Sequence, residues 1–544
     1  MKSIEAQYYL ADLEPSYQAI LDEFDQTHIG FKVWGRDRDL FKTTDSVMLD
    51  WLFGPSDVLA SLDELKAMEA RVRAGKYSSV VLLGMGGSSL APLVFKTIFA
   101  KHMPFFILDT IHPESIRRIA EQIDVATTLF IVASKSGTTL ESNLLYRYFW
   151  HVLKAQGVEA VAENFMAITD PKTPLRQESL AQGFLPGPMG KPNIGGRFSA
   201  FSAFGMMPAM LLGLDVERLL KSAQHMADAC GPSMMARNNP GALLGAFLAA
   251  CAENNRDRLA IYLDHTLLPL GLWFEQLIAE SLGKEGGGLV PILAKPHQRF
   301  HNSASIYIYF GEKNNSAYTD NTSPSVRISM ADLYDISGVM YQFQMAVALA
   351  GAALGVNPFD QPNVEHSKRH TRAMIDNLSQ VSPQVPGQVP SSSKVEQDNF
   401  FADMTLKEFL SSVEPNDYVA ILSFLDERDD IHQYLEKLST KISHKTGVPV
   451  LIQCGPRYLH STGQLFKGGR NNGKFLFITG PYEHDLVSED QIKFSAIHMS
   501  QALGDIHALR ENGRTVCQVH LHQVDTGFTS MIQAICSEPN RNVF

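Results

Sequence analysis

Short apolar runs alternate with helical patterns in the first half of the chain. Residues 78–83 (SSVVLL), 105–109 (FFILD) and 128–134 (TLFIVAS) have the length and continuity of buried strands. Helical patterns at 89–100 and 113–123 separate them. Strands about 25 residues apart with helices between them are typical of βαβ units. The pattern predicts an α/β fold with a doubly wound parallel sheet.

A second series of the same kind begins near residue 258. Apolar runs at 259–264 (LAIYLD) and 305–310 (SIYIYF) flank a helical pattern at 270–282, and a long helical stretch follows at 331–354. Similar spacing in the two halves predicts two sheet-and-helix subdomains.

A segment rich in Pro, Gln and Ser at 379–400 has no apolar periodicity and predicts a linker. Beyond it, strand patterns return at 418–422, 449–453, 474–479 and 516–521, which indicates a smaller third α/β domain. The predicted division is a helical or irregular segment (1–77), two subdomains (78–230 and 231–378), a linker (379–402) and a C-terminal α/β domain (403–544).

Composition narrows the class of protein. A chain of 544 residues exceeds the size at which one hydrophobic core stops growing, about 250–300 residues. The 47 basic and 58 acidic residues give a net charge of −11, which disfavours a nucleic-acid partner. No apolar run approaches the ~18 residues of a membrane span. Five scattered cysteines, without a C-x-x-C pair, favour a reducing cytoplasm.

Two turns each connect the end of a predicted strand to the start of a predicted helix. The first is G-M-G-G-S-S at 84–89, whose glycines allow a ligand to approach the backbone. The second is S-K-S-G-T-T at 134–139, with four hydroxyls and one ammonium suited to phosphate oxygens. A plain turn and an N-cap cluster are the alternatives. Open α/β sheets bind ligands at such strand ends, so together the turns favour a phosphate site.

Two further motifs carry charge. In G-G-R-F-S at 195–199, the glycines allow Arg197 to approach a substrate oxygen, and a structural ion pair is the alternative. Gln276 and Glu280 are i and i+4 on one helix face, where apolar neighbours can raise the pKa of a carboxyl and make it a base. A solvated helix face is the alternative.

Taken together, these motifs resemble the phosphoglucose isomerase family. G-x-G-G-S, S-K-S-G-T-T, G-G-R-F-S, Q-x-x-x-E-S and N-P-F-D-Q-P-N-V-E-H-S-K (357–368) occur in the order of that family. The likeness is strongest to the isomerase half of bifunctional transaldolase/phosphoglucose isomerases, because 455–465 looks like the C-terminal extension of that group. Only about 75 residues precede the first predicted strand, so we expect no transaldolase activity.

The resemblance implies interconversion of glucose 6-phosphate and fructose 6-phosphate through a cis-enediolate, a reaction of glycolysis and gluconeogenesis that uses no metal and no organic cofactor. It implies that Glu280 is the proton-transfer base, that Arg197 stabilises the enediolate and that Lys368 takes part in ring opening. The implied substrate-binding residues are Gly87, Ser88, Ser134, Lys135, Ser136, Thr139, Gly196, Gln276 and Gln361.

One departure from the family concerns histidine. The family's G-x-x-x-Q-H segment is missing, and the corresponding stretch 295–303 has different spacing. His301, His366 and His460 remain candidates for the ring-opening imidazole. Our hypothesis is that the C-terminal domain closes over the substrate cleft and that His460 or a neighbour completes the site. A histidine remote from substrate is the alternative.

Other functions remain open from the sequence. One is an isomerase that also uses mannose 6-phosphate, and another is a non-catalytic sugar-phosphate sensor. Retention of Glu280, Arg197 and Lys368 argues against the sensor. His520 and His522 share a predicted strand face but lack a third metal ligand, so we expect no metal site. A homodimer is compatible with the resemblance.

Overall fold

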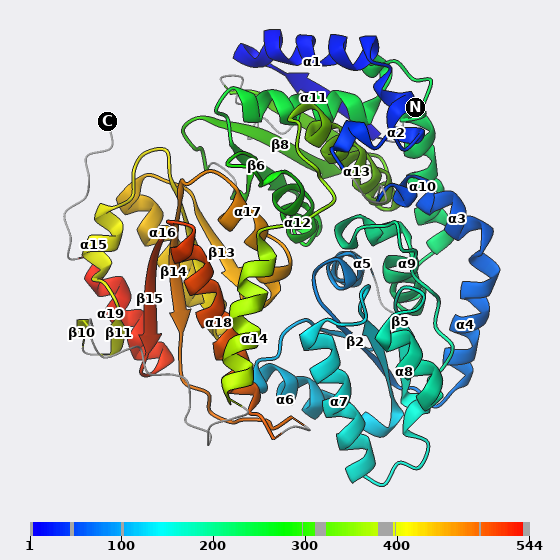
Figure 1. Ribbon diagram of the computed structural model, residues 1–544, viewed down its shortest axis with the longest axis vertical. Helices are drawn as coiled ribbons and strands as arrows, with labels where there is room; N and C mark the ends of the chain where they lie inside the picture. The colour runs from blue at the N-terminus through cyan, green and yellow to red at the C-terminus, as the bar shows by residue number, and fades with distance from the viewer. Residues whose placement is uncertain are drawn as a thin grey trace. The chain divides into compact units, whose positions relative to one another are not determined.

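The computed structural model describes residues 4–43, 48–99, 103–295, 298–310, 323–378, 395–397, 399–488 and 491–536. The chain forms two compact units. Unit 1 contains Met1–Ile107 and Ile123–Gln361, and unit 2 contains Leu108–Gln122 and Pro362–Phe544. The strands and helices predicted from the hydrophobic pattern are present, with ends shifted by a few residues (Figure 1).

The first sheet of unit 1 has four strands in the order β3-β2-β4-β5. They are β2 (Ser79–Gly84), β3 (Phe105–Leu108), β4 (Thr128–Ala133) and β5 (Phe165–Ile168). Strands β2 and β4 pair in parallel and are buried at every position, as expected for a parallel sheet covered on both faces. The helices around this sheet are α5 (Leu90–Ile98), α7 (Leu140–Ala155), α8 (Pro174–Gln182) and α9 (Ala203–Leu211).

The second sheet of unit 1 has five strands in the order β1-β9-β8-β6-β7. They are β1 (Ile4–Tyr9), β6 (Arg258–Leu263), β7 (Val290–Leu293), β8 (Ser303–Phe310) and β9 (Ser325–Met330). Strands β6 to β9 are parallel, whereas β1 pairs antiparallel with β9 at the edge. The N-terminal segment was predicted to be helical or irregular, and its first described residues form this strand instead.

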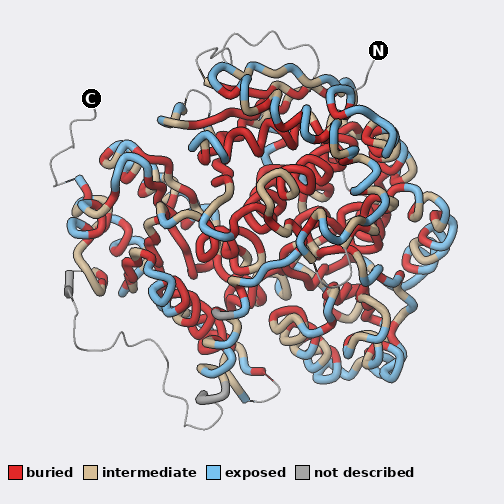
Figure 2. Tube along the Cα trace, turned by 45° about the horizontal axis from the view of Figure 1, so that its top comes forward, coloured by how far each residue is buried: buried red, intermediate tan, exposed pale blue. Residues whose placement is uncertain are grey.

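A buried helix, α13 (Ile336–Ala353), is central to unit 1. It packs against α10 (Val216–Ala229), α11 (Pro240–Glu253) and α12 (Leu270–Leu282). The expectation that no apolar run approaches the length of a membrane span is wrong for residues 333–353, which are long and apolar enough to cross a membrane. However, 89% of the apolar window is buried inside the protein, as in a core helix. Buried segments of this kind are red in Figure 2. The N-terminal helices are α1 (Glu14–Gln26), α2 (Ile29–Trp34), α3 (Gly54–Ala60) and α4 (Leu62–Ala74).

Unit 2 is built on a six-stranded sheet in the order β10-β11-β15-β14-β12-β13. The strands are β10 (Val395–Gln397), β11 (Phe400–Ala402), β12 (Tyr418–Phe424), β13 (Val450–Cys454), β14 (Gly473–Thr479) and β15 (Thr515–Leu521). Strands β12 to β15 are parallel, and β10 and β11 add antiparallel. Residues 379–394 of the predicted linker lie outside the described residues, whereas its last part contains β10 and β11.

Within the described residues, the C-terminal part of the chain gives unit 2 six α-helices. They are α14 (Val364–Leu378), α15 (Leu406–Ser411), α16 (Asp429–Thr446), α17 (Gly463–Gly468), α18 (Phe494–Glu511) and α19 (Val524–Cys536). Helix α14 is held on α18, because the Ser367 hydroxyl donates to Asp505 at 2.8 Å. Asp505 also forms an ion pair with Lys467 at 2.6 Å, with both side chains fully buried.

Residues 108–122, including α6 (Pro113–Gln122), also belong to unit 2. Asp426, just after β12, accepts hydrogen bonds from Ser115 and Arg118, both at 2.5 Å. Arg457, just after β13, forms a bidentate pair with Asp109 at 2.7 and 2.9 Å. The carboxyl ends of parallel strands are where open α/β sheets bind ligands. Part of this edge in unit 2 is therefore taken up by a segment of the chain itself.

Candidate functional site

The predicted glycine turn directly follows β2 in unit 1. Gly86 has a φ of 52°, a conformation that favours glycine. A Cβ on Gly87 would lie 2.1 Å from the carbonyl oxygen of Gly196, so the two backbones are in direct contact. The Ser199 hydroxyl donates to the carbonyls of Gly196 (2.6 Å) and Gly87 (3.3 Å). The structure thus joins two predicted motifs, G-G-S-S and G-G-R-F-S, through their backbones.

The hydroxyl-rich turn follows β4, whose last residue pairs with the last residue of β2. The Ser134 and Thr139 hydroxyls lie 2.8 Å apart, and those of Ser136 and Thr138 lie 2.9 Å apart. Gly137 reverses the chain with a φ of 69°. The turn leads into α7. The first N–H groups of a helix have no partner within the helix and lie at the positive end of its dipole. Hydroxyl groups at a helix N-terminus are well suited to a phosphate.

Lys135 lies in the same turn but has partners elsewhere in unit 1. Its ammonium forms an ion pair with Asp170 and donates to the carbonyl of Lys191 at 2.7 Å. Burial lowers the pKa of Lys135 and raises that of Asp170. The ammonium is therefore neutralised by Asp170, and its part in a phosphate cradle stays a prediction.

Arg197 is buried, with 2% of its side chain exposed. It lies in the 3-10 helix Gly196–Phe201 that follows the glycine pair. Its Nε donates to the Ser281 hydroxyl at 2.7 Å. One terminal nitrogen donates to the carbonyls of Pro358 (2.6 Å) and Asp360 (2.8 Å). Burial lowers the pKa of the guanidinium, so these acceptors must replace the water that it loses.

Glu280 contacts the remaining nitrogen of Arg197. Its Oε1 lies 3.2 Å from that nitrogen, which also donates to Oε1 of Gln361 at 3.1 Å. The other carboxylate oxygen accepts from Nε2 of Gln276 at 3.1 Å, so the predicted i, i+4 pair is present on α12. The structure thus brings together Gln276, Glu280, Arg197 and Gln361, with 11% of the Glu280 side chain exposed.

Four contacting residues around this pair had no role predicted from the sequence. They are Ser281, Lys284, Pro358 and Asp360. Ser281 and Lys284 stand in the motif of Glu280, and Pro358 and Asp360 stand beside Gln361. Two of them act through backbone carbonyls, which leave no side-chain signature in a sequence.

Lys368 and His460 belong to unit 2. Lys368, on α14, pairs with Glu365 at 2.7 Å and is 39% exposed. His460 is half-buried in the 3-10 helix Arg457–His460 after β13. In unit 1, His301 is exposed. The side chain of His366 lies outside the described residues. The roles of Lys368 and of the three histidines stay predictions.

No cluster of three or more His, Cys, Asp or Glu side chains that could hold a metal ion occurs within the described part of the chain. His520, one of the two histidines considered as ligands, pairs through Nδ1 with the Thr479 hydroxyl at 2.9 Å.

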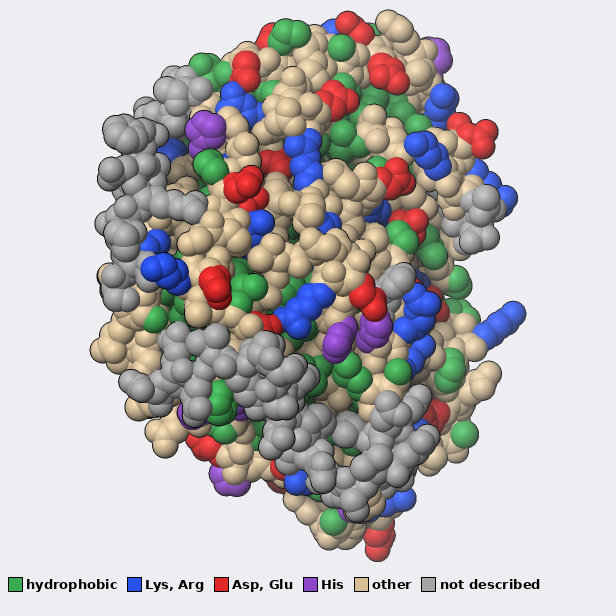
Figure 3. Space-filling view, turned by 60° about the vertical axis from the view of Figure 1, so that its left-hand side comes forward, with side chains coloured by type: hydrophobic (Ala, Val, Ile, Leu, Met, Phe, Trp, Pro, Cys, Tyr) green, Lys and Arg blue, Asp and Glu red, His purple; other side chains and the backbone are tan. Residues whose placement is uncertain are grey.

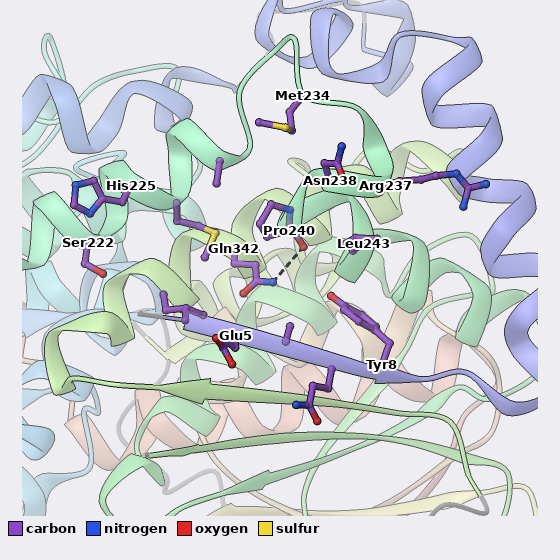
Figure 4. A pocket seen from close by; sticks show the side chains of 15 residues that line it. Glu5, Tyr8, Ser222, His225, Met234, Arg237, Asn238, Pro240, Leu243 and Gln342 are labelled. Atoms are coloured by element: carbon purple, nitrogen blue, oxygen red, sulfur yellow. Dashed lines mark hydrogen bonds between the residues drawn. The ribbon is translucent and has the colours of Figure 1, made fainter. Parts of the chain in front are cut away.

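A cavity of 910 Å³ lies elsewhere in unit 1, along β1. Residues of α10, of the 234–243 region and of α13 line its other sides (Figure 4). Gln342 donates there to the carbonyl of Pro240 at 3.2 Å. The cavity contains none of the predicted site residues.

Fold and site together define an α/β protein with two doubly wound sheets in unit 1 and a buried carboxylate–guanidinium pair. A family model described as "Phosphoglucose isomerase" matches residues 42–318. The chain belongs to the phosphoglucose isomerase family.

Two curated relatives show the extent of the similarity. A "Probable glucose-6-phosphate isomerase" of Haloarcula marismortui is 29% identical over 58% of this chain and 84% of its own length. A "Glucose-6-phosphate isomerase" of Methanocaldococcus jannaschii is 25% identical over 57% of this chain and 86% of its own length.

Two solved structures have a similar fold. A hypothetical protein from Thermus thermophilus has a TM-score of 0.59 at 22% identity, covering 68% of this chain and 100% of its own. A glucose-6-phosphate isomerase from Chlamydia trachomatis has a TM-score of 0.58 at 20% identity, covering 70% of this chain and 90% of its own. Both support the predicted fold class.

The contact between the glycine backbones gives a first prediction. A methyl group in Gly87→Ala would lie 2.1 Å from the Gly196 carbonyl oxygen, so the backbone that carries Arg197 must move. We expect kcat of the isomerase reaction to fall about 100-fold, because a displacement of about 1 Å has this effect. In the control Gly195→Ala, the methyl group meets only Phe198 at 3.7 Å, and we expect less than about a twofold change. Equal activity of both variants would contradict the prediction.

Proposed function

We propose that this protein is an aldose–ketose isomerase that interconverts glucose 6-phosphate and fructose 6-phosphate through a cis-enediolate. Membership of the phosphoglucose isomerase family and the names of the curated relatives support this function. The observation that carries it is the contact between Glu280 and Arg197, 3.2 Å apart and almost wholly buried. This pair combines a base with a fixed positive charge.

The proposed reaction moves one proton between neighbouring carbons. The Glu280 carboxylate takes the C2 proton of open-chain glucose 6-phosphate, and the electron pair of the C–H bond forms the enediolate. The protonated carboxyl then gives that proton to C1, while a proton passes between the two oxygens, and fructose 6-phosphate results. Arg197 stabilises the negative charge on the enediolate oxygens, which is the kind of preorganised electrostatic contribution worth several kcal/mol.

The phosphate group of the substrate has a proposed site at the hydroxyl turn. Ser134, Ser136 and Thr139 supply hydroxyl donors before α7, and Ser88 lies in the neighbouring turn after β2. Because β2 and β4 are adjacent parallel strands, both turns lie at the same edge of the sheet. In this proposal, the phosphate is bound by neutral hydroxyl donors and by the N-terminus of α7.

Ring opening is assigned only by the resemblance to the family. We propose that Lys368 acts at the ring oxygen and that a histidine assists, with His301, His366 and His460 as the candidates. His460 remains the hypothesis for a site completed by the C-terminal domain. Comparing His460→Ala with the parent on cyclic and open-chain substrates would distinguish this role from structural support, because a ring-opening role requires a larger loss of activity on the cyclic sugar.

A non-catalytic sensor is disfavoured by energetics. Burying a guanidinium and a carboxylate together has a desolvation cost of several kcal/mol per ion. A protein that only binds sugar phosphate does not need a buried carboxylate as a base. Use of mannose 6-phosphate and the absence of transaldolase activity stay predictions.

Location and partners are also proposals. The described cysteines form no disulfide, which supports the proposal of a reducing cytoplasm. Basic and acidic side chains are interspersed on the face drawn in Figure 3, and the net charge is −11, so we propose no nucleic-acid partner.

The first test of this function is a coupled assay with purified protein. We expect fructose 6-phosphate to be converted to glucose 6-phosphate with a chelator present and without any added cofactor. The proposed proton transfer uses the carboxylate of Glu280 and the guanidinium of Arg197, so no metal ion is needed. Activity that disappears with the chelator and returns with a divalent ion would contradict the cofactor-free reaction, and complete inactivity would contradict the function.

The base has its own test, Glu280→Gln. The amide keeps the size of the side chain but cannot accept the proton, so we expect kcat to fall by about two to four orders of magnitude. Binding of a sugar-phosphate inhibitor should persist and shows that the variant is folded. Glu285→Gln, an exposed change just beyond the same helix, is the matched control. Parent-like turnover of Glu280→Gln would remove Glu280 from its role.

The phosphate site is tested by Ser134→Ala and Thr139→Ala. Each change deletes a hydrogen bond to a charged group, worth about 1.5–3 kcal/mol, so we expect KM to rise about 10- to 100-fold. The two hydroxyls bond each other at 2.8 Å, so the double variant should lose less than the sum. Thr97→Ala, an exposed hydroxyl on α5, is the control. Unchanged inhibitor affinity in both single variants would place the phosphate elsewhere.

A further inference from the structure

Lys284 is a buried lysine beside the Glu280–Arg197 pair. It lies just beyond the end of α12, and only 3% of its side chain is exposed. The chain turns sharply after it, with positive φ values of 52° at Glu285 and 75° at Gly286. Lysine is almost never fully buried unless it is paired, so its partners indicate what the burial achieves.

The Lys284 ammonium is bound entirely by one loop. It donates to the backbone carbonyl of Asn357, to the carbonyl of Asp360 at 2.6 Å and to Oδ1 of Asp360 at 2.6 Å. An ammonium group has three N–H donors. All three are thus directed to residues 357–360, which are far from Lys284 in the sequence.

The same loop binds Arg197. The carbonyls of Pro358 and Asp360 accept from one guanidinium nitrogen, and the Gln361 side chain accepts from the other. The Asp360 carbonyl therefore accepts hydrogen bonds from Lys284 and Arg197 together. If this loop moved, Arg197 would lose two carbonyl acceptors, the adjacent Gln361 would be displaced with it, and the orientation of Arg197 toward Glu280 would no longer be fixed.

We propose that Lys284 is a positioning residue for the isomerase reaction, whose ammonium holds loop 357–360 so that the Arg197 guanidinium is oriented against Glu280. This inference rests on the proposed function. Lys284 touches no reacting atom in it. Its effect reaches the substrate through the loop and Arg197.

The charge of Lys284 makes the arrangement sensitive to pH. The pKa of Lys284 is lowered to about 8. Burial is the main cause and Arg197 adds to it, whereas Asp360 and Glu280 act in the opposite direction. At pH 7 the ammonium is charged and has three donors. Above about pH 8 the amine is neutral and has one N–H donor fewer. Its hydrogen bonds and its ion pair to loop 357–360 are then weaker.

Loss of activity by this route differs from alkaline unfolding. The pKa of Lys284 in the folded chain lies below its ordinary value of 10.5. Between about pH 8 and 10.5 the unfolded chain therefore binds more protons, and the contribution of Lys284 to stability rises with pH. Activity and this contribution to stability thus change in opposite directions over that range.

The test compares kcat between pH 6.5 and 9.5 for four full-length proteins: the parent, Lys284→Met, Asp360→Asn and the control Lys221→Met. Lys221 is an exposed lysine on α10. We expect the parent to lose activity with an apparent pKa near 8. Asp360→Asn keeps the backbone carbonyl but removes the anion that favours the charged form of Lys284. The alkaline fall in kcat of this variant should therefore begin at lower pH than in the parent. Asp360 is half exposed, so this variant should fold.

For Lys284→Met we expect kcat about 10- to 100-fold below the parent at pH 7, with little change in KM. Its kcat should show no alkaline fall near pH 8. Lys221→Met should match the parent. An identical alkaline limb in the parent, Lys284→Met and Asp360→Asn would overturn the inference while leaving the isomerase function intact. If Lys284→Met does not fold, the direction of the limb in Asp360→Asn decides alone. A parent without isomerase activity would overturn both proposals.

Discussion

The buried guanidinium of Arg197 is the constraint on which the site depends. With 2% of its side chain exposed, it needs protein acceptors for its N–H groups, and these come from α12, the loop 357–360 and Gln361. Hydrogen bonds to the Arg197 guanidinium therefore fix segments that are far apart in the sequence. The close backbone contact at Gly87 also limits the position of Arg197, because only glycine leaves room for the Gly196 carbonyl. The position of Arg197 thus follows from hydrogen bonding and steric exclusion together.

Much of this fold could be predicted from local patterns. Strands β2 and β4 are continuous apolar runs, and the Gln276–Glu280 pair follows from helical spacing. Strand β1 was missed because its partner β9 lies over 300 residues away and its burial alternates between partial and exposed positions. Strand β7 is four residues long and contains a proline, which weakens a strand pattern.

The sequence allowed the functional side chains of the site to be predicted, but not the backbone carbonyls that bind them. Glycine, serine and threonine at strand ends have a recognisable chemistry, and so does a carboxylate on an apolar helix. The acceptors of Arg197 and Lys284 are mostly carbonyls of residues 357–360, and any residue supplies a carbonyl. Likewise, nothing in the pattern of 113–123 indicates that α6 belongs with unit 2, because the contacts that join it to that unit, such as the Arg118–Asp426 ion pair, link residues 308 positions apart in the sequence. Hydrophobic periodicity along the sequence carries no information about polar contacts between residues that are far apart in the chain.

The charges around Glu280 explain why such a polar cluster can be kept in a buried site. Arg197 pairs with Glu280 and Lys284 pairs with Asp360, so two cationic side chains face two carboxylates and the four formal charges cancel. When Glu280 takes a proton from carbon, its negative charge disappears and an equal charge forms on the enediolate oxygens. The net charge of the site therefore stays constant through the reaction. The cations need not move, and fixed cations facing a migrating negative charge are what electrostatic preorganisation requires.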